Sequence, residues 1–231
     1  SGAERLPAKT ALFEKLDALS SPQAILATST STLAMTNIAK RTQRPERCIV
    51  AHPYNPPYLV PLVELVPGER TSRKTVEETV SLMERLGKVP VVQKKEAVGA
   101  IGNRITAAIW REAIHIVLEG IAGPQQVDKA MTAGPGFRLA VLGPFLTYHL
   151  GGGEGGIASY VRRMGPTMSE RWKTLGAWNA LSDEDEERLV ESVERMETVR
   201  RMSVGELVGW RDERLAALLR TRNAMRGRIN E

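Results

Sequence analysis

Short apolar runs that alternate with amphipathic segments characterise the first part of the chain. The runs are four or five residues long and occupy positions 24–28, 48–51, 62–66 and 89–92. Between them, Leu12, Phe13, Leu16 and Leu19 recur at helical spacing, and residues 71–86 form a second amphipathic segment that Gly87 closes. Short apolar runs separated by helical patterns predict strands of an at least partly parallel sheet that is covered by helices.

From about Ala97 onward the pattern changes to sustained helical periodicity. It predicts helices over residues 101–120, 124–133, 155–164, 183–202 and 204–226. Ser182 and Asp183 offer side-chain oxygens for an N-cap before an acidic first turn, which favours a helix start at this point. We therefore predict an α/β domain in residues 1–96 that is followed by an all-α domain in residues 97–231.

A glycine-rich segment, residues 151–156, satisfies the spacing G-x-G-x-x-G that marks dinucleotide-binding turns. Such a turn has to follow a strand inside a βαβ unit, with an acidic residue about 20 positions further on. This segment instead lies deep in the helical half, after residues 144–150. We interpret it as a loop between helices.

Composition limits the class of protein without identifying it. Of the 231 residues, 42% are hydrophobic and 26% are charged, which is ordinary for a soluble globular protein. No apolar run approaches the roughly 18 residues of a membrane span. The single cysteine, Cys48, excludes an internal disulfide and fits a reducing compartment, so we expect a cytoplasmic protein without a membrane partner. The net charge of +5 owes much to arginines in residues 214–228, and mixed charges elsewhere indicate a solvated helix end rather than a nucleic-acid site.

The most specific chemistry lies in residues 48–66. His52 ends one apolar run, a proline-rich turn follows, and Glu64 stands in the middle of the next run. A carboxylate buried among leucine and valine is costly unless it has a partner, and a histidine can accept or donate a proton near neutral pH. Two strands joined by a turn would bring Glu64 against His52 and give a base with an orienting partner.

Four motifs follow one another along the chain. They are the hydroxyl cluster at 29–32, the motif His52-x-x-Asn55-Pro56, the pair Val63–Glu64, and Gly102–Asn103–Arg104 at a helix start. With this spacing the chain resembles the 3-hydroxyacyl-CoA dehydrogenase superfamily over essentially its whole length. Residues 48–53, 55–58, 61–67 and 210–213 resemble in particular its λ-crystallin, or L-gulonate 3-dehydrogenase, branch. The resemblance implies that residues 1–96 are the remaining part of a Rossmann-like NAD-binding domain and that residues 97–231 are a helical dimerisation domain.

The resemblance also implies catalytic roles for four residues. His52 would be the general base that takes the proton of the substrate hydroxyl while hydride goes to NAD, and Glu64 would orient its ring. Ser31, which would also border the cofactor, and Asn103 would hydrogen-bond the reacting oxygen. Alternatives remain open: a structural histidine at a strand end, one of the hydroxyl neighbours in place of Ser31, and a plain helix N-cap for Asn103.

Three further residues are binding candidates. By the resemblance, Asn55 would lie near the nicotinamide and Lys9 would approach the cofactor, although an exposed helical lysine is the simpler interpretation of Lys9. From its loop, 134–138, we infer that Arg138 could bind a substrate carboxylate in bidentate fashion. No metal site is expected.

The predicted function is NAD-dependent oxidation of an L-3-hydroxyacyl-CoA or a small L-3-hydroxy acid by a homodimer. A gulonate-type sugar-acid dehydrogenase, a non-catalytic λ-crystallin-like structural protein and a helical dimerisation module are the alternatives. Family members begin with a strand and a glycine-rich turn that binds the NAD pyrophosphate, which residues 4–9 do not resemble. On the order of 60–90 residues of that domain are therefore expected to be missing, so that the chain as given would bind NAD poorly.

Overall fold

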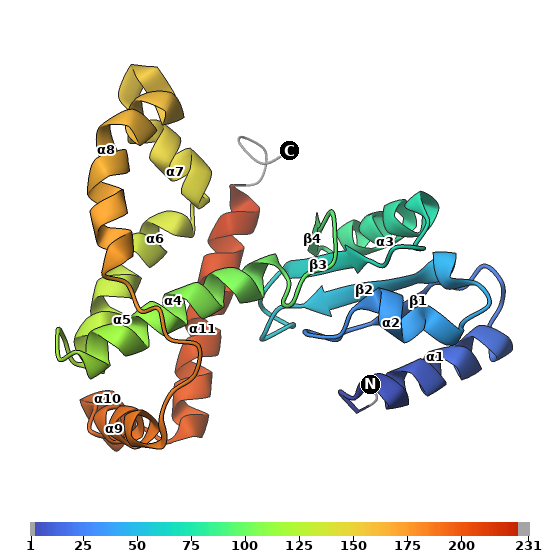
Figure 1. The fold of residues 1–231 in the computed structure, drawn as a ribbon, viewed down its shortest axis with the longest axis horizontal. Helices are drawn as coiled ribbons and strands as arrows, with labels where there is room; N and C mark the ends of the chain where they lie inside the picture. Colours follow the sequence, from blue (N-terminus) through green and yellow to red (C-terminus); the bar gives the residue numbers. More distant parts are fainter. Residues whose placement is uncertain (1–2, 226–231) are drawn as a thin grey trace. The chain divides into compact units, whose positions relative to one another are not determined.

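The structure, a computed structural model, describes residues 3–225 (Figure 1). The chain divides into two compact units. One comprises Ser1–Thr106 together with Leu207–Glu231, and the other comprises Ala107–Glu206. The predicted domain boundary at residues 96 and 97 stays a prediction.

A four-stranded mixed sheet forms the centre of the first unit. Its strands are β1 (Leu26–Thr28), β2 (Cys48–Pro53), β3 (Leu62–Pro67) and β4 (Val89–Val92), and they lie side by side in this order. β1 pairs with β2 and β3 pairs with β4 in parallel, whereas β2 and β3 are antiparallel. The predicted α/β class, with a sheet that is only partly parallel, is therefore confirmed.

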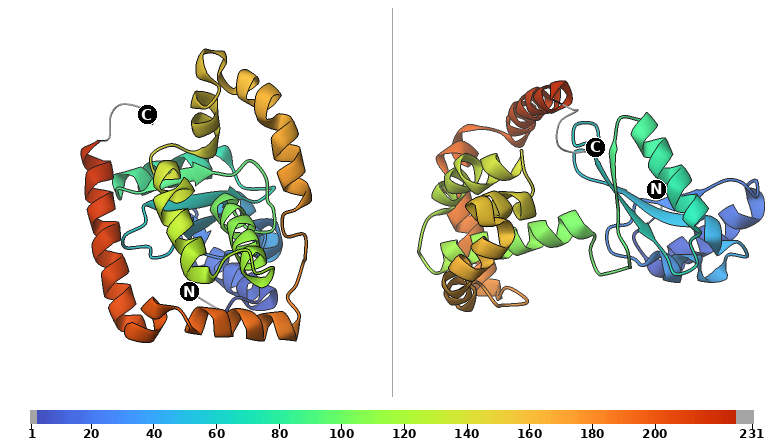
Figure 2. Two further views of the ribbon diagram at one scale, coloured as in Figure 1. Left: turned by 90° about the vertical axis from the view of Figure 1, so that its left-hand side faces the viewer. Right: turned by 90° about the horizontal axis from the view of Figure 1, so that it is seen from above.

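Helices cover both faces of this sheet (Figures 1 and 2). On one face lie α1 (Leu6–Leu19), the short α2 (Met35–Ile38) and the 3₁₀ turns Ala39–Arg41 and Pro45–Arg47, and on the other lies α3 (Arg73–Arg85). Side chains of β2 alternate between the two faces, as the pleat requires. Cys48 and Val50 pack with Phe13 and Met35 on the α1 side, while Ile49 belongs to the cluster on the α3 side.

The buried face of α1 differs from the prediction. The predicted apolar face consisted of Leu12, Phe13, Leu16 and Leu19. In the structure Phe13 is buried together with Lys9 and Asp17, one helical turn before and after it, whereas Leu19 is 86% exposed. Lys9 and Asp17 can be buried because each has an oppositely charged partner, Glu4 and Arg47 respectively, which removes the cost of burying an isolated charge.

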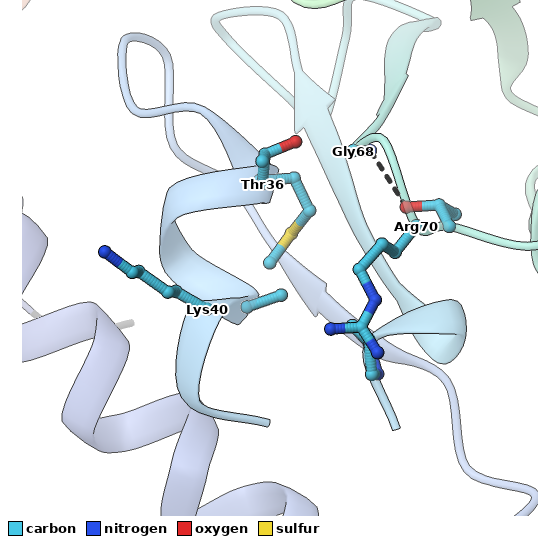
Figure 3. Close-up of a pocket in the computed structure, with 8 residues that line it drawn as sticks. Thr36, Lys40, Gly68 and Arg70 are labelled. Atoms are coloured by element: carbon cyan, nitrogen blue, oxygen red, sulfur yellow. Dashed lines mark hydrogen bonds between the residues drawn. The ribbon is translucent and has the colours of Figure 1, made fainter. Parts of the chain in front are cut away.

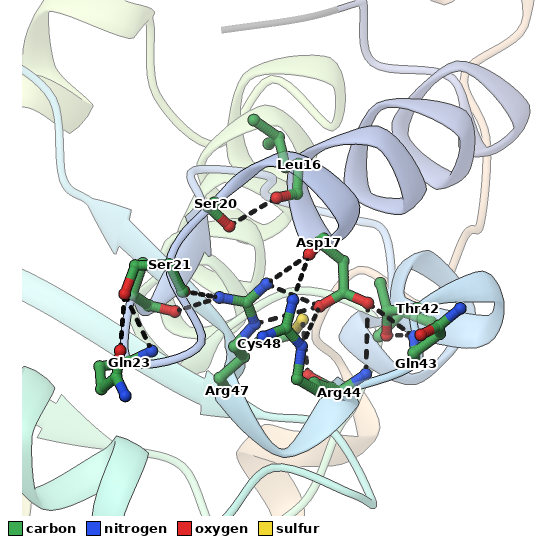
Figure 4. A network of polar contacts seen from close by, with 12 residues as sticks. Leu16, Asp17, Ser20, Ser21, Gln23, Thr42, Gln43, Arg44, Arg47 and Cys48 are labelled. Atoms are coloured by element: carbon green, nitrogen blue, oxygen red, sulfur yellow. Dashed lines mark hydrogen bonds and ion pairs between the residues drawn. The ribbon is translucent and has the colours of Figure 1, made fainter.

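A buried ion pair joins α1 to the segment that leads into β2 (Figure 4). The Arg47 guanidinium donates to the Asp17 carboxylate from Nε at 3.1 Å and from Nη2 at 2.7 Å, and also to the backbone carbonyl of Asp17 at 2.8 Å. The backbone N–H of Gln43 donates to the same carboxylate at 2.7 Å. Because Arg47 immediately precedes β2, this network lies at the start of the strand that carries His52.

The rest of the chain is helical, which confirms the predicted all-α second half. Its helices are α4 (Ile101–Leu118), α5 (Pro124–Ala133), α6 (Pro135–Leu139), α7 (Pro144–Leu150), α8 (Gly156–Lys173), α9 (Asp183–Glu194), α10 (Glu197–Arg201) and α11 (Val204–Ala224). None of the helices in residues 3–225 is both long and apolar enough to cross a membrane.

Several helix boundaries differ from the predicted ones. The helix expected over residues 183–202 is interrupted at Met196, whose φ of −59° and ψ of 132° are not helical. The predicted end of the last helix at Arg226 lies outside the described residues. The glycine-rich segment 151–156 connects α7 to α8 through a 3₁₀ turn, so it is an inter-helix connection as predicted.

Candidate active site

The antiparallel pair β2 and β3 brings His52 and Glu64 together. The two residues are register partners, so their side chains leave the same face of the sheet. His52 Nδ1 lies 3.3 Å from Glu64 Oε2, and the two side chains are 13% and 2% exposed. Their predicted proximity is confirmed, and their catalytic roles stay predictions.

Glu64 has a second partner that the sequence did not reveal. The backbone N–H of Gly102, in the first turn of α4, donates to Glu64 Oε1 at 2.7 Å. Both oxygens of this buried carboxylate are thus engaged, one by the imidazole and the other by a main-chain amide. The arrangement satisfies a buried charge with hydrogen bonds on both sides.

The hydroxyl cluster that follows β1 separates into buried and exposed members. Thr30 is buried: its hydroxyl bonds to Glu4 and accepts the backbone N–H of Leu33 at 3.1 Å. Ser31 is exposed, beyond the end of β1. Of the two neighbours, Thr30 is therefore occupied by structural hydrogen bonds, whereas Ser31 is accessible to a ligand.

Lys9 is a buried cation rather than an exposed helical lysine, so the simpler interpretation of this residue was wrong. It is 5% exposed, and its Nζ lies 3.0 Å from Glu4 Oε2 and 3.4 Å from the Thr28 hydroxyl at the end of β1. Burial on its own would raise the pKa of Glu4, but the hydrogen bonds from Thr30 and Lys9 outweigh it and hold this pKa below its usual value. Lys9 and Glu4 thus form an ion pair beside the strand end.

The remaining candidates lie at the start of α4, in the segment after β2 and on α6. Asn103 is half-buried in the first turn of α4, directly after Gly102, and the helix begins at Ile101, so Asn103 is not its N-cap. Asn55 is exposed, three residues beyond His52. Arg138 is exposed on α6 of the other unit, and its role stays a prediction.

Two tyrosines after β2 make contacts that sequence reasoning missed. The hydroxyl of Tyr54 hydrogen-bonds with that of Thr106 on α4. The hydroxyl of Tyr58 donates to Asp212 on α11 at 2.8 Å, and Asp212 is also paired with Arg211 at 2.7 Å. The bond to Asp212 raises the pKa of Tyr58. Segment 210–213, which stood out in the sequence, therefore contacts the loop that follows His52.

A small cavity in the first unit is lined by none of the predicted site residues. A cavity of about 30 Å³, about the volume of one water molecule in the liquid, lies between α2 and the turn after β3 and is lined by Thr36, Lys40, Gly68 and Arg70 among others (Figure 3). In the part of the chain that the structure describes, no three His, Cys, Asp or Glu side chains gather as metal ligands would. The His52–Glu64 pair and the adjacent ends of β1 and β2 are thus the candidate site.

Comparisons with known proteins agree on one family. Residues 1–97 match the profile described as "3-hydroxyacyl-CoA dehydrogenase, NAD binding domain", and residues 99–192 match "3-hydroxyacyl-CoA dehydrogenase, C-terminal domain". An L-carnitine dehydrogenase of Nocardiopsis dassonvillei is 43% identical over 95% of this chain and 66% of its own length. An L-carnitine dehydrogenase of Burkholderia mallei is 40% identical over 99% of this chain and 70% of its own length. The chain thus spans about two thirds of the length of these relatives.

Solved structures give the same picture. FHMPC 5-dehydrogenase, an NAD⁺-dependent dismutase, superposes with a TM-score of 0.78 at 25% identity, over 98% of this chain and 72% of that one. The (S)-3-hydroxybutyryl-CoA dehydrogenase of Ralstonia eutropha superposes with a TM-score of 0.54 at 25% identity, over 84% of this chain and 62% of that one. As the sequence motifs predicted, the chain belongs to the NAD-binding 3-hydroxyacyl-CoA dehydrogenase family of oxidoreductases.

Proposed function

We propose that this protein oxidises the 3-hydroxyl group of a small L-3-hydroxy acid to the ketone with NAD, with His52 as the general base. The observation that carries the proposal is the pairing of His52 with the buried carboxylate of Glu64 at 3.3 Å. A neutral imidazole whose Nδ1–H donates to Glu64 presents the lone pair of Nε2 to a substrate hydroxyl. Glu64 then stabilises the imidazolium that forms when the proton is transferred.

The residues around the strand ends fit the nicotinamide half of a dinucleotide. β1 and β2 are parallel neighbours, so the segments that follow them, with Ser31 and Asn55, leave the same edge of the sheet, where such sheets bind ligands. Lys9 lies at this edge beside Thr28. Bound NAD would accept the hydride, and we assign to Lys9 and Asn55 the role of positioning it.

Ser31 and Asn103 would orient the reacting oxygen. Ser31 is exposed, and the side-chain amide of Asn103, one residue after the Glu64 contact, can donate to an oxygen beside His52. Holding the hydroxyl in line for transfer to His52 Nε2 is the kind of alignment that accelerates proton transfer by roughly 10²–10⁴-fold. Arg138 stays our candidate for binding the substrate carboxylate.

L-Carnitine is the first substrate to test. The relatives named above are L-carnitine dehydrogenases at 43% and 40% identity, and L-carnitine is itself a small L-3-hydroxy acid. A 3-hydroxyacyl-CoA, as in the family description, and L-gulonate are the competing substrates. The complete encoded protein would be assayed for NADH formation with L-carnitine, L-3-hydroxybutyrate, L-gulonate and L-3-hydroxybutyryl-CoA.

Two variants test the role of His52. We expect His52→Gln to lose at least roughly 10²-fold in kcat, whereas His149→Gln, in the exposed end of α7, should keep wild-type turnover. Turnover of the thioester alone would refute the free-acid assignment. Turnover of none of the four compounds would favour the non-catalytic alternative, and a fully active His52→Gln variant would refute His52 as the base.

We also propose that the helical unit forms a homodimer interface. Within Ala107–Glu206, which the structure describes throughout, one large hydrophobic side chain, Ile114, is fully buried at 3% exposure. On and between α6 and α7, Phe137, Val141 and Phe145 are 74%, 70% and 83% exposed. Apolar patches of this kind mark association surfaces, and a second copy of the chain would cover them.

Sedimentation of the protein tests this interface. We expect a dimer that Phe145→Asp dissociates and that Leu19→Asp, at an equally exposed position on α1, leaves intact. A monomer for the unmodified protein, or equal effects of the two substitutions, would refute the proposed surface.

A further inference from the structure

The carboxylate of Glu64 is held by a hydrogen bond that belongs to neither strand. Gly102 is the second residue of α4, so its backbone N–H has no acceptor within the helix. It donates instead to Glu64 Oε1 at 2.7 Å, while Glu64 Oε2 faces His52 Nδ1 at 3.3 Å. The start of α4, the buried carboxylate and the imidazole therefore form one chain of hydrogen bonds.

This chain of hydrogen bonds has a direction. A backbone amide can only donate, so Glu64 Oε1 has to be an acceptor and cannot carry a proton. A glutamate side chain is ordinarily a carboxylate at neutral pH, and both of its oxygens then accept hydrogen bonds. With Glu64 ionised, His52 has to donate from Nδ1, which leaves the lone pair on Nε2.

The absence of a side chain at residue 102 allows this close approach. A Cβ added to Gly102 would lie 3.0 Å from Tyr54 Cε2, 3.5 Å from Glu64 Oε1 and 3.5 Å from Leu62 Cδ2. Tyr54 cannot move away freely because its hydroxyl is bonded to Thr106 on the same helix. Glycine in a helix is less favourable than alanine by about 1 kcal/mol, so a contact such as this one gives a reason for its presence.

We propose that the backbone N–H of Gly102 is a positioning group of the active site, which orients Glu64 and thereby holds His52 in the tautomer that can act as base. The proposal rests on the proposed function for its catalytic meaning. Its geometric content, the tautomer of His52 and its dependence on Gly102, can be measured without any turnover. The two hypotheses can therefore fail separately.

Replacement of Glu64 by glutamine gives the sharpest test. In Glu64→Gln the side-chain oxygen has to face the Gly102 N–H, so the amide NH₂ group faces His52 Nδ1. The neutral ring must then accept at Nδ1 and carry its proton on Nε2, the reverse of the wild-type tautomer. Nitrogen-15 NMR of the imidazoles reports this directly. The chain has three histidines, so His115 and His149 serve as internal references that should not change.

We expect the wild-type ring to be in the Nδ1–H form and the Glu64→Gln ring to be in the Nε2–H form. An unchanged Nδ1–H tautomer in Glu64→Gln would refute the proposal, since it would mean that Gly102 does not fix the side chain.

A measurement on the unmodified chain covers the case in which the Glu64→Gln variant does not fold. Glu184 occupies in α9 the same second position that Gly102 occupies in α4, and it is exposed. We expect the Gly102 amide to exchange with solvent more than about tenfold more slowly than that of Glu184, because its hydrogen bond to Glu64 is buried. Equal exchange rates would refute the proposal.

Turnover then separates the two hypotheses. If the complete protein oxidises a 3-hydroxy acid, Glu64→Gln should lower kcat on the order of 10⁴-fold, as a wrong histidine tautomer does in serine proteases. An active wild type with an unreversed tautomer would refute the role of Gly102 alone. A reversed tautomer in a protein that oxidises no 3-hydroxy acid would refute the proposed function alone.

Discussion

Replacement of Arg47 by methionine tests how strongly the buried ion pair supports the sheet. Arg47 and Asp17 have side chains that are 6% and 4% exposed. Methionine keeps most of the apolar stem and removes the guanidinium, which donates to the Asp17 carboxylate and to the carbonyls of Asp17, Ser21 and Ala24 (Figure 4). The substitution leaves a buried carboxylate without its main partner.

The expected loss is about 3 kcal/mol of unfolding free energy. Removing one member of a buried ion pair typically costs about 3–5 kcal/mol, because the other charge stays buried. Here the Asp17 carboxylate keeps the backbone N–H groups of Gln43 at 2.7 Å and Arg44 at 3.3 Å, and the Arg44 side chain at 3.4 Å. These donors place the loss at the lower end of the range. Arg41→Met is the matched control: its pair with Glu14, at 3.7 Å, is exposed and should contribute below about 1 kcal/mol.

The loss of unfolding free energy in Arg47→Met should be smaller in acid. Burial is the largest effect on Asp17 and raises its pKa, but the hydrogen bond from Arg47, the amides of Gln43 and Arg44, and the Arg47 charge together bring this pKa below its ordinary value. A carboxyl group whose pKa is lower in the folded state stabilises the fold above its unfolded pKa of about 3.9 and loses this contribution as pH falls through the folded pKa. Arg47→Met removes much of the shift, so wild type and variant should converge below about pH 4.

Urea unfolding, followed with two probes, measures this loss of unfolding free energy. Accessibility of the Cys48 thiol reports on β2, whereas the tryptophans, at positions 110, 172, 178 and 210, report on the helical half. We expect Arg47→Met to lower the urea concentration at the midpoint of the Cys48 transition at pH 7, and to lower it much less at pH 3. A loss at pH 7 that does not exceed that of Arg41→Met, or one that stays the same in acid, would refute the reasoning.

Three further predictions concern separate parts of the chain. Burial raises the pKa of Cys48 to about 11, so the folded protein should not react with iodoacetamide at pH 8 and should react once urea unfolds it; rapid alkylation of the native protein would contradict this. Ser182→Ala removes the N-cap bond to the Asp185 amide at 3.1 Å and should cost about 1 kcal/mol of α9 stability, measured by amide exchange, whereas Ser169→Ala within α8 should not. Tyr58→Phe and Asp212→Ala should each speed amide exchange in residues 54–60, and the double variant should add nothing further, because both remove the same hydrogen bond; additive effects would show that the bond at 2.8 Å does not hold this loop.

The strands and the central pair could be predicted because each depends on short-range pattern. Apolar runs of four or five residues locate strands, and a carboxylate between Val63 and Leu65 requires a partner that His52 supplies. Gly87, with φ at +72°, ends α3 as the sequence suggested. Few other conformations bury these apolar runs, give the carboxylate a partner and place a glycine at the helix end, so the sequence pattern was sufficient to locate these features.

Other features depend on partners that are distant in sequence. The simpler interpretation of Lys9 was an exposed helical lysine, and nothing in the sequence singled out Asp17. Their burial is explained by their partners, Glu4 and the Arg47 guanidinium. The bond from Gly102 to Glu64 spans 38 positions and involves a backbone atom, which no side-chain pattern can indicate. α6 and α7 each begin with proline after glycine, at Pro135 and Pro144, a start signal that could have located both.

The antiparallel pairing of β2 with β3 is what makes the candidate site possible, and the apolar residues around Glu64 determine its register. Val63 and Leu65, which are 4% and 0% exposed, belong to the cluster on the α3 side, so Glu64 between them has to face the side of His52. A slip by one residue would turn Glu64 toward the α3 cluster and remove Val63 and Leu65 from it. Each of those side chains contributes roughly 1.5–3 kcal/mol by burial, and an unpaired carboxylate would add its own cost. The packing of the α3 face therefore holds His52 and Glu64 opposite each other. Substitutions in the cluster on the α3 side should disturb the site even though they replace none of its residues.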